Sequence, residues 1–182
     1  MGMTSYIALL RGINVGGHKS IAMADLRDLV TRLGFLDART VLQSGNLVFR
    51  SAARPAAQLE QLLETETARQ FDLQTHFFVR TALEWQAIVA RNPFRAEAAR
   101  DPGHLLVLFL ERAPAVANLK ALEAAITGPE TIRAEGREMY VVYPIGVGRS
   151  RLTNTLIEKK LGTRTTGRNW NTVLKLGALA KG

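Results

Sequence analysis

Apolar positions in the first 80 residues change their period several times, and each change predicts a new element. A short apolar run at residues 6–10 is typical of a strand. Apolar residues then recur at helical spacing, and Gly34 follows where a helix C-cap is expected. The predicted elements are strand 6–10, helix 23–33, strands 40–43 and 46–50 around the turn Ser44-Gly45, helix 55–71 and strand 73–80. This βαββαβ order is that of the ferredoxin-like motif.

A related order begins again at residue 104. The predicted elements are strand 104–110, helix 114–126, strands 130–134 and 138–143 around the turn Glu135-Gly136, and helix 152–161 closed by Gly162. In place of a last strand, residues 163–168 lead to a final helix over 170–179. We therefore predict an α+β protein of two ferredoxin-like halves, the second modified at its C-terminus by an extra helix.

A linking segment separates the predicted halves. Thr81 and Glu84 have the spacing of a capping box, which predicts a helix that Asn92-Pro93 ends. Residues 94–103 then form the predicted boundary loop. The expected domains are a ferredoxin-like half over 1–80, a linking helix and loop over 81–103, and a second half over 104–182.

The predicted strands are apolar on both alternating faces. A sheet with one solvated face alternates polar and apolar residues, so we expect both faces to be covered. The cover is either the other half of the chain or a partner subunit, which leaves a homodimer open. Tyr6, Phe49 and Phe78 are then expected to pack in the core rather than to stack on bases.

Composition excludes several kinds of chemistry. The chain has 182 residues and no cysteine, which excludes disulfides and thiolate chemistry and fits a reducing compartment. The apolar run at 6–10 is too short for a signal-peptide core, and no run approaches a membrane span. The three histidines are widely spaced and no carboxylate cluster accompanies them, so we expect no metal site and no cofactor. A cytoplasmic protein without a membrane segment is expected.

The charge is concentrated near the C-terminus. The net charge of the chain is +8, and residues 149–182 hold eight basic side chains against the single acid Glu158. Such a segment can attract nucleic acid, phosphates or an acidic partner. An ordinary solvated helical face would have the same composition.

The glycine-rich loop at residues 11–19 lies between the first predicted strand and helix. It offers Gly12, Gly16 and Gly17 for close backbone approach, and Arg11, Asn14 and Lys19 as donors to an anion. The glycine spacing fits neither G-x-x-x-x-G-K-[ST] nor G-x-G-x-x-G, so no nucleotide fingerprint is present. A tight turn of the chain explains the glycines equally well.

Two further segments repeat these ingredients. Residues 144–151 form a second glycine loop with Arg149 and Arg151, and Ser150 is placed to cap the following helix. Residues 165–172 surround Trp170 with hydrogen-bonding side chains. There, Arg168, Asn169 and Asn171 are candidate ligand contacts, and helix capping by Asn169 with core anchoring by Trp170 is the alternative.

Catalytic patterns are sparse. His18 lies inside the first glycine loop and is the one candidate acid or base. His76 and His104 border predicted strands, where structural roles are expected. No nucleophile–histidine–acid pattern and no paired carboxylates are recognisable in the sequence.

Several blocks in one order resemble a known family. The segments YIALLRGINVGG, MADLRDLVTRLGF, VLQSGNLVF, RNPF and TTGRNWNTVLKL closely resemble domain of unknown function 1697, found mostly in bacteria. The resemblance runs from about Tyr6 to Leu176. It implies an α+β fold of ferredoxin-like halves and carries no assigned reaction or ligand.

Three functions remain open from the sequence. The leading hypothesis is a protein that binds a phosphate-bearing ligand through the glycine loop and the basic segment, with RNA or DNA backbone ahead of a free nucleotide. The first alternative is an enzyme for a small phosphorylated substrate, with Arg11, Asn14, Arg168 and Asn169 as donors and His18 as proton carrier. The second is an oligomeric structural subunit without a ligand.

Overall fold

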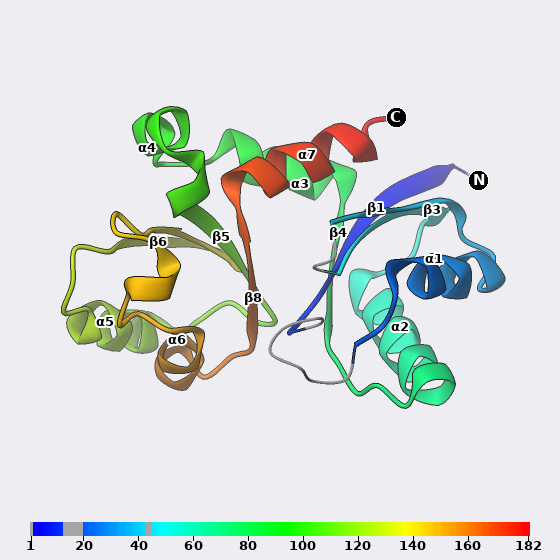
Figure 1. The fold of residues 1–182 in the computed structure, drawn as a ribbon, viewed down its shortest axis with the longest axis horizontal. Helices are drawn as coiled ribbons and strands as arrows, with labels where there is room; N and C mark the ends of the chain where they lie inside the picture. The colour runs from blue at the N-terminus through cyan, green and yellow to red at the C-terminus, as the bar shows by residue number, and fades with distance from the viewer. Residues whose placement is uncertain (1, 13–19, 43–44) are drawn as a thin grey trace. The chain divides into compact units, whose positions relative to one another are not determined.

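The protein is an α+β protein with two four-stranded antiparallel sheets (Figure 1). A computed structural model describes residues 2–12, 20–42 and 45–182, and this part of the chain holds seven α-helices. Contacts divide the chain into two compact units. Unit 1 is Met1–Ala87 with Lys175–Gly182, and unit 2 is Ile88–Leu174. Across the described ranges, no helix is both long and apolar enough to cross a membrane.

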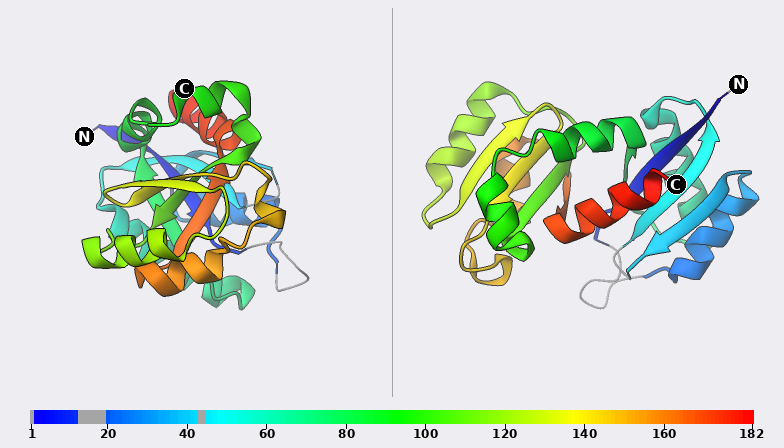
Figure 2. Two further views of the ribbon diagram at one scale, coloured as in Figure 1. Left: turned by 90° about the vertical axis from the view of Figure 1, so that its left-hand side faces the viewer. Right: turned by 90° about the horizontal axis from the view of Figure 1, so that it is seen from above.

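Unit 1 contains a sheet with strand order β2-β3-β1-β4, in which all neighbours are antiparallel. Its elements are β1 (Met3–Leu10), α1 (Met23–Arg32), β2 (Leu36–Val41), β3 (Asn46–Ala52), α2 (Ala56–Phe71) and β4 (Phe77–Thr81). Figure 2 shows α1 and α2 on one face of this sheet. Leu26 of α1 and Leu63 of α2 join Phe49 of β3 in one buried cluster. Gly34 has φ +83° directly after the C-cap Leu33, which confirms the predicted end of the helix.

Unit 2 contains a sheet with the equivalent order β6-β7-β5-β8, again fully antiparallel. Its elements are α4 (Arg95–Arg100), the 3-10 turn η1 (Pro102–His104), β5 (Leu105–Leu110), α5 (Val116–Ala125), β6 (Thr131–Glu135), β7 (Glu138–Val142), the 3-10 turn η2 (Val147–Arg149), α6 (Asn154–Leu161) and β8 (Thr165–Asn169). Two helices, α3 (Ala82–Ala90) and α7 (Trp170–Ala180), continue from one unit into the other. Leu122 of α5 and Ile157 of α6 pack with Val141 of β7.

Two sequence predictions are wrong in this region. Residues 94–103, predicted to be a boundary loop, contain α4 and most of η1. The segment expected in place of a last strand contains β8, which pairs with β5. Its sequence, TTGRN, lacks the apolar residues by which strands are recognised. Gly167 lets β8 lie close to β5, since a Cβ there would lie 2.7 Å from the Leu108 side chain, which would have to shift.

The central strands are buried on both faces, as predicted. Tyr6 to Leu10 are at most 1% exposed, and every residue of β7 is buried. The Tyr6 and Phe49 rings stack with centroids 5.7 Å apart, and the Tyr6 hydroxyl donates to the Arg54 carbonyl oxygen at 3.0 Å. Phe78 is 3% exposed. These three aromatic residues are therefore core residues, which confirms the prediction and argues against base stacking on them.

Candidate functional site

Sheet register brings several predicted site residues to one end of the unit 2 sheet. At this end β5 begins, and its neighbours β7 and β8 end. Leu105 pairs with Val142 on one side, and Leu106 pairs with Asn169 on the other. Because β5 lies between them, the segments that follow β7 and β8 leave the sheet on either side of His104, about 10 Å apart. We call this region the His104 end.

The loop at residues 144–151 follows β7 at the His104 end. Gly146 has φ +86°, a conformation that favours glycine, and a Cβ there would lie 3.5 Å from His104 Nε2. The Gly146 carbonyl accepts the Arg149 amide at 3.3 Å. Arg149 and Arg151 are exposed. Within the described residues neither guanidinium has an ion pair or hydrogen bond, so both can bind an anion.

Ser150 holds this loop in place, and its predicted role as the cap of α6 is wrong. Its hydroxyl donates to the buried Glu130, which precedes β6, and accepts the Leu152 amide at 3.0 Å. The N-cap of α6 is Thr153, whose side chain accepts the Leu156 amide at 3.2 Å. Thr153 therefore caps α6. Ser150 instead links the loop to Glu130, beside β6.

An aspartate–histidine pair lies at the centre of this end. His104 Nδ1 is 2.7 Å from Asp101 Oδ2, and both side chains are about half exposed. The two groups are within ion-pair distance, and among the described residues His104 Nδ1 is a buried atom without a hydrogen-bond partner. The sequence predicts a structural role for His104, because the 3-10 turn that places Asp101 against it has no clear sequence signal. The D-x-x-H spacing is the signal that could have found the pair.

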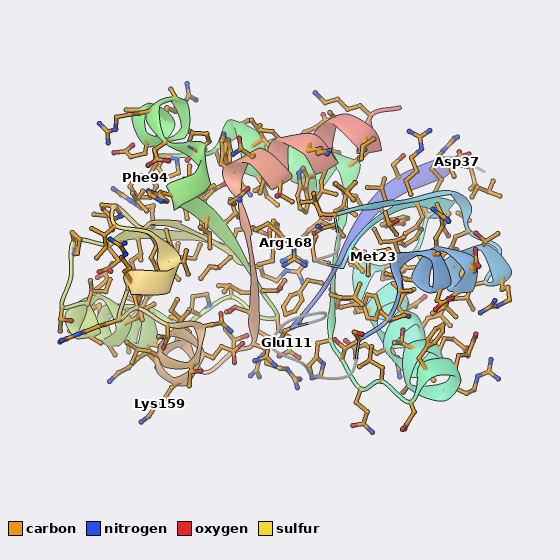
Figure 3. The ribbon with its side chains drawn as sticks, in the orientation of Figure 1. Met23, Asp37, Phe94, Glu111, Lys159 and Arg168 are labelled. Atoms are coloured by element: carbon orange, nitrogen blue, oxygen red, sulfur yellow. The ribbon has the colours of Figure 1, made fainter. Side chains whose placement is uncertain are left out.

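The residues of the TTGRN segment divide between structural and exposed positions. Arg168 is buried on β8 (Figure 3) and donates to Thr166 Oγ1 and to the Gly167 carbonyl, both at 2.8 Å. Burial lowers the pKa of Arg168 to about 10. Asn169 Oδ1 accepts the Thr172 amide at 3.0 Å, which confirms the predicted cap. Asn171, in the first turn of α7, is exposed.

Only the beginning of the first glycine loop lies within the described residues. The Arg11 amide donates to the His76 carbonyl at 3.0 Å, and the Arg11 carbonyl accepts from Thr75 Oγ1 at 3.0 Å. Gly12 has φ +65° with open space around its Cβ position. Asn14, Gly16, Gly17, His18 and Lys19 lie outside the described residues. The anion site at this loop stays a prediction.

The basic side chains of residues 149–182 that belong to unit 2 do not form one surface. Arg149 and Arg151 lie at the His104 end, Lys159 lies on α6 (Figure 3), and Arg168 is buried. Arg164 pairs with Glu111 through two nitrogens, at 2.9 and 3.1 Å. The predicted basic segment thus provides separate groups of exposed cations in this unit.

The fold places the chain among α+β proteins with two four-stranded antiparallel sheets. The model of the family described as "Protein of unknown function (DUF1697)" matches residues 3–140, and the chain belongs to this family. A solved structure of the conserved bacterial protein SP0830 from Streptococcus pneumoniae is similar, with a TM-score of 0.78 and 26% identity. The match covers 98% of this chain and 99% of that protein. No curated protein matches the sequence.

Proposed function

We propose that the protein binds a phosphate-bearing ligand at the His104 end, and that this ligand is the backbone of RNA or DNA. The observation that carries the proposal is the pair of exposed guanidinium groups on one braced loop, Arg149 and Arg151, without a partner among the described residues. Arginine is suited to phosphate because its planar fork donates two parallel hydrogen bonds.

The span of this end favours a polymer over a single phosphate. Asn171 is exposed beyond β8, on the other side of His104 from the arginine loop. The two sides are about 10 Å apart, which is wider than one phosphate group. The aromatic residues of the unit 1 sheet are buried, so contacts to phosphate rather than to bases are expected. Binding without strong sequence preference follows.

We further propose that each βαββαβ unit is a ferredoxin-like half. The equivalent sheet orders β2-β3-β1-β4 and β6-β7-β5-β8 support this assignment. The second half then ends with β8, and α7 is the extra C-terminal helix.

Fluorescence anisotropy with a labelled single-stranded RNA at low salt tests the proposed binding. The double variant Arg149→Gln/Arg151→Gln is expected to bind at least about tenfold more weakly, since two charge-assisted contacts are lost. Lys120→Gln is the control, because Lys120 is an exposed cation on α5 and does not lie on the loop. Equal affinity of the double variant and the control would contradict the proposal.

A second candidate is an enzyme for a small phosphorylated substrate, with His104 rather than His18 as the proton carrier. The Asp101 contact favours this function because it places a carboxylate 2.7 Å from a partly exposed imidazole, a pairing that general acid–base catalysis uses. In an assay with phosphate esters, Asp101→Asn and His104→Gln are expected to lower kcat by about a hundredfold with little change in KM. Absence of turnover by the wild-type protein would exclude this candidate.

A further inference from the structure

A cavity lies at the opposite end of the unit 2 sheet from His104. Here β5 ends and β8 begins, and one face of α6 lines the same space. Its volume is about 460 Å³, and it is open to solvent because most of the residues that line it are exposed. The side chains that matter for its chemistry are Glu111, Arg112, Thr155, Glu158, Lys159 and Arg164. We call it the Lys159 cavity.

The two acidic side chains of the cavity are already engaged. Both carboxylate oxygens of Glu111 accept from Arg164, at 2.9 and 3.1 Å. Glu158 Oε1 accepts the Thr165 amide at 2.8 Å and Asn154 Nδ2 at 3.2 Å. These contacts use acceptor capacity that a cationic ligand would need.

Hydrogen-bond donors remain available in the cavity. The Arg112 amide donates to Thr163 Oγ1, and one guanidinium nitrogen donates to the Gly162 carbonyl, each at 3.1 Å. These bonds orient Arg112 and leave its other N–H groups free. Neither the Lys159 ammonium nor the Thr155 hydroxyl has a side-chain partner within the part of the chain that the structure describes. The hydrogen-bond donors still available to a ligand are therefore those of two cationic side chains and one hydroxyl.

We propose that the Lys159 cavity binds a small phosphorylated molecule through Arg112 and Lys159. Its lining has three cationic and two carboxylate side chains, so an anion offsets the excess positive charge. The oriented Arg112 can donate in parallel to two phosphate oxygens, and Lys159 adds a point charge. This site lies at the other end of the sheet from Arg149 and Arg151, and the proposal does not rest on nucleic-acid binding.

Isothermal titration calorimetry with pyrophosphate tests the cavity. We expect the wild-type protein to bind, and Arg112→Gln and Lys159→Gln each to weaken binding by about tenfold or more. Lys160→Gln is the matched control, because Lys160 neighbours Lys159 on α6 and does not line the cavity. Melting temperatures of all variants show that they are folded. Since Lys159 is exposed, its variant keeps the test valid if Arg112→Gln unfolds.

Three results would overturn the inference. One is no heat of binding with the wild-type protein at millimolar pyrophosphate. Another is equal weakening by Lys160→Gln and Lys159→Gln, which would indicate a diffuse charge effect. The third is loss of pyrophosphate binding in Arg149→Gln/Arg151→Gln with full binding in Lys159→Gln, which would place the anion at the His104 end. Loss of RNA binding alone leaves the cavity proposal intact, so the two proposals fail separately.

Discussion

At the scale of single residues, buried polar groups in unit 2 are held by specific partners. The Tyr143 hydroxyl donates to the Leu152 carbonyl at 3.1 Å, and the Tyr140 hydroxyl donates to the Ile88 carbonyl. Burial raises the pKa of each tyrosine to about 12. Arg168 has the opposite linkage, because burial lowers its pKa to about 10. As pH rises above 10, the tyrosines therefore lower the stability of the folded unit, and Arg168 raises it.

The pH dependence of Tyr143→Phe isolates one of these terms. Between pH 10 and 12 the unfolded tyrosine loses its proton while the folded one keeps it, so its contribution to stability falls as pH rises. At pH 9 the variant should be less stable by about 1 kcal/mol, the value of one hydrogen bond. In urea unfolding the difference should shrink above pH 10 and change sign before pH 12, since the rise of the Tyr143 pKa to about 12 outweighs one hydrogen bond. A difference that stays constant over this range would contradict the assigned burial.

At the scale of elements, the sequence predicts a helix end correctly where one capping residue or capping box has no competing candidate nearby. Gly162 at φ +68° closes α6 as predicted. The Thr81–Glu84 capping box opens α3, with the Thr81 amide 2.7 Å from the Glu84 carboxylate. The start of α6 was misassigned because Ser150 and Thr153 are both good caps. Tertiary contacts determine which of the two residues caps the helix. Here the Ser150 hydroxyl donates to Glu130, and Thr153 is the cap.

Thr153→Ala tests the corrected cap of α6. Loss of the bond to the Leu156 amide is expected to lower the free energy of unfolding by about 1 kcal/mol in urea. Thr155→Ala is the matched control in the same helix, where Thr155 makes no cap and alanine has the higher helix propensity. A larger loss in Thr155→Ala than in Thr153→Ala would refute the assignment.

The strands show where apolar pattern stops being informative. β1, β5 and β7 were predicted because buried central strands are continuously apolar. The strand β8 was missed because its place depends on long-range pairing with β5 and on the close approach of Gly167 to Leu108. The aspartate–histidine pair was missed for a related reason, since it requires a turn that the sequence does not specify clearly.

At the scale of the whole molecule, the two units repeat one plan down to individual positions. Arg80 of β4 pairs with Ile7, and Arg168 of β8 pairs with Val107 in the equivalent register. Each arginine donates to the carbonyl of the preceding residue. The next residue in each case, Thr81 or Asn169, caps the following helix. The structure of the second unit is thus more similar to that of the first unit than its sequence suggests.

The distribution of charge supports the proposed function. Composition alone predicted one basic segment, but burial and ion pairing leave Arg149 and Arg151 as the exposed basic pair at the His104 end. A polyanion bound there releases counterions, so log K should fall linearly with log salt concentration.

The most direct test is the salt dependence of RNA binding by the wild-type protein and by Arg149→Gln/Arg151→Gln. If the two arginines contact phosphates, the slope of log K against log salt should be smaller by about 1.4 in the double variant, at about 0.7 per single-strand contact. Identical slopes, or no RNA binding by the wild-type protein at low salt, would contradict the account.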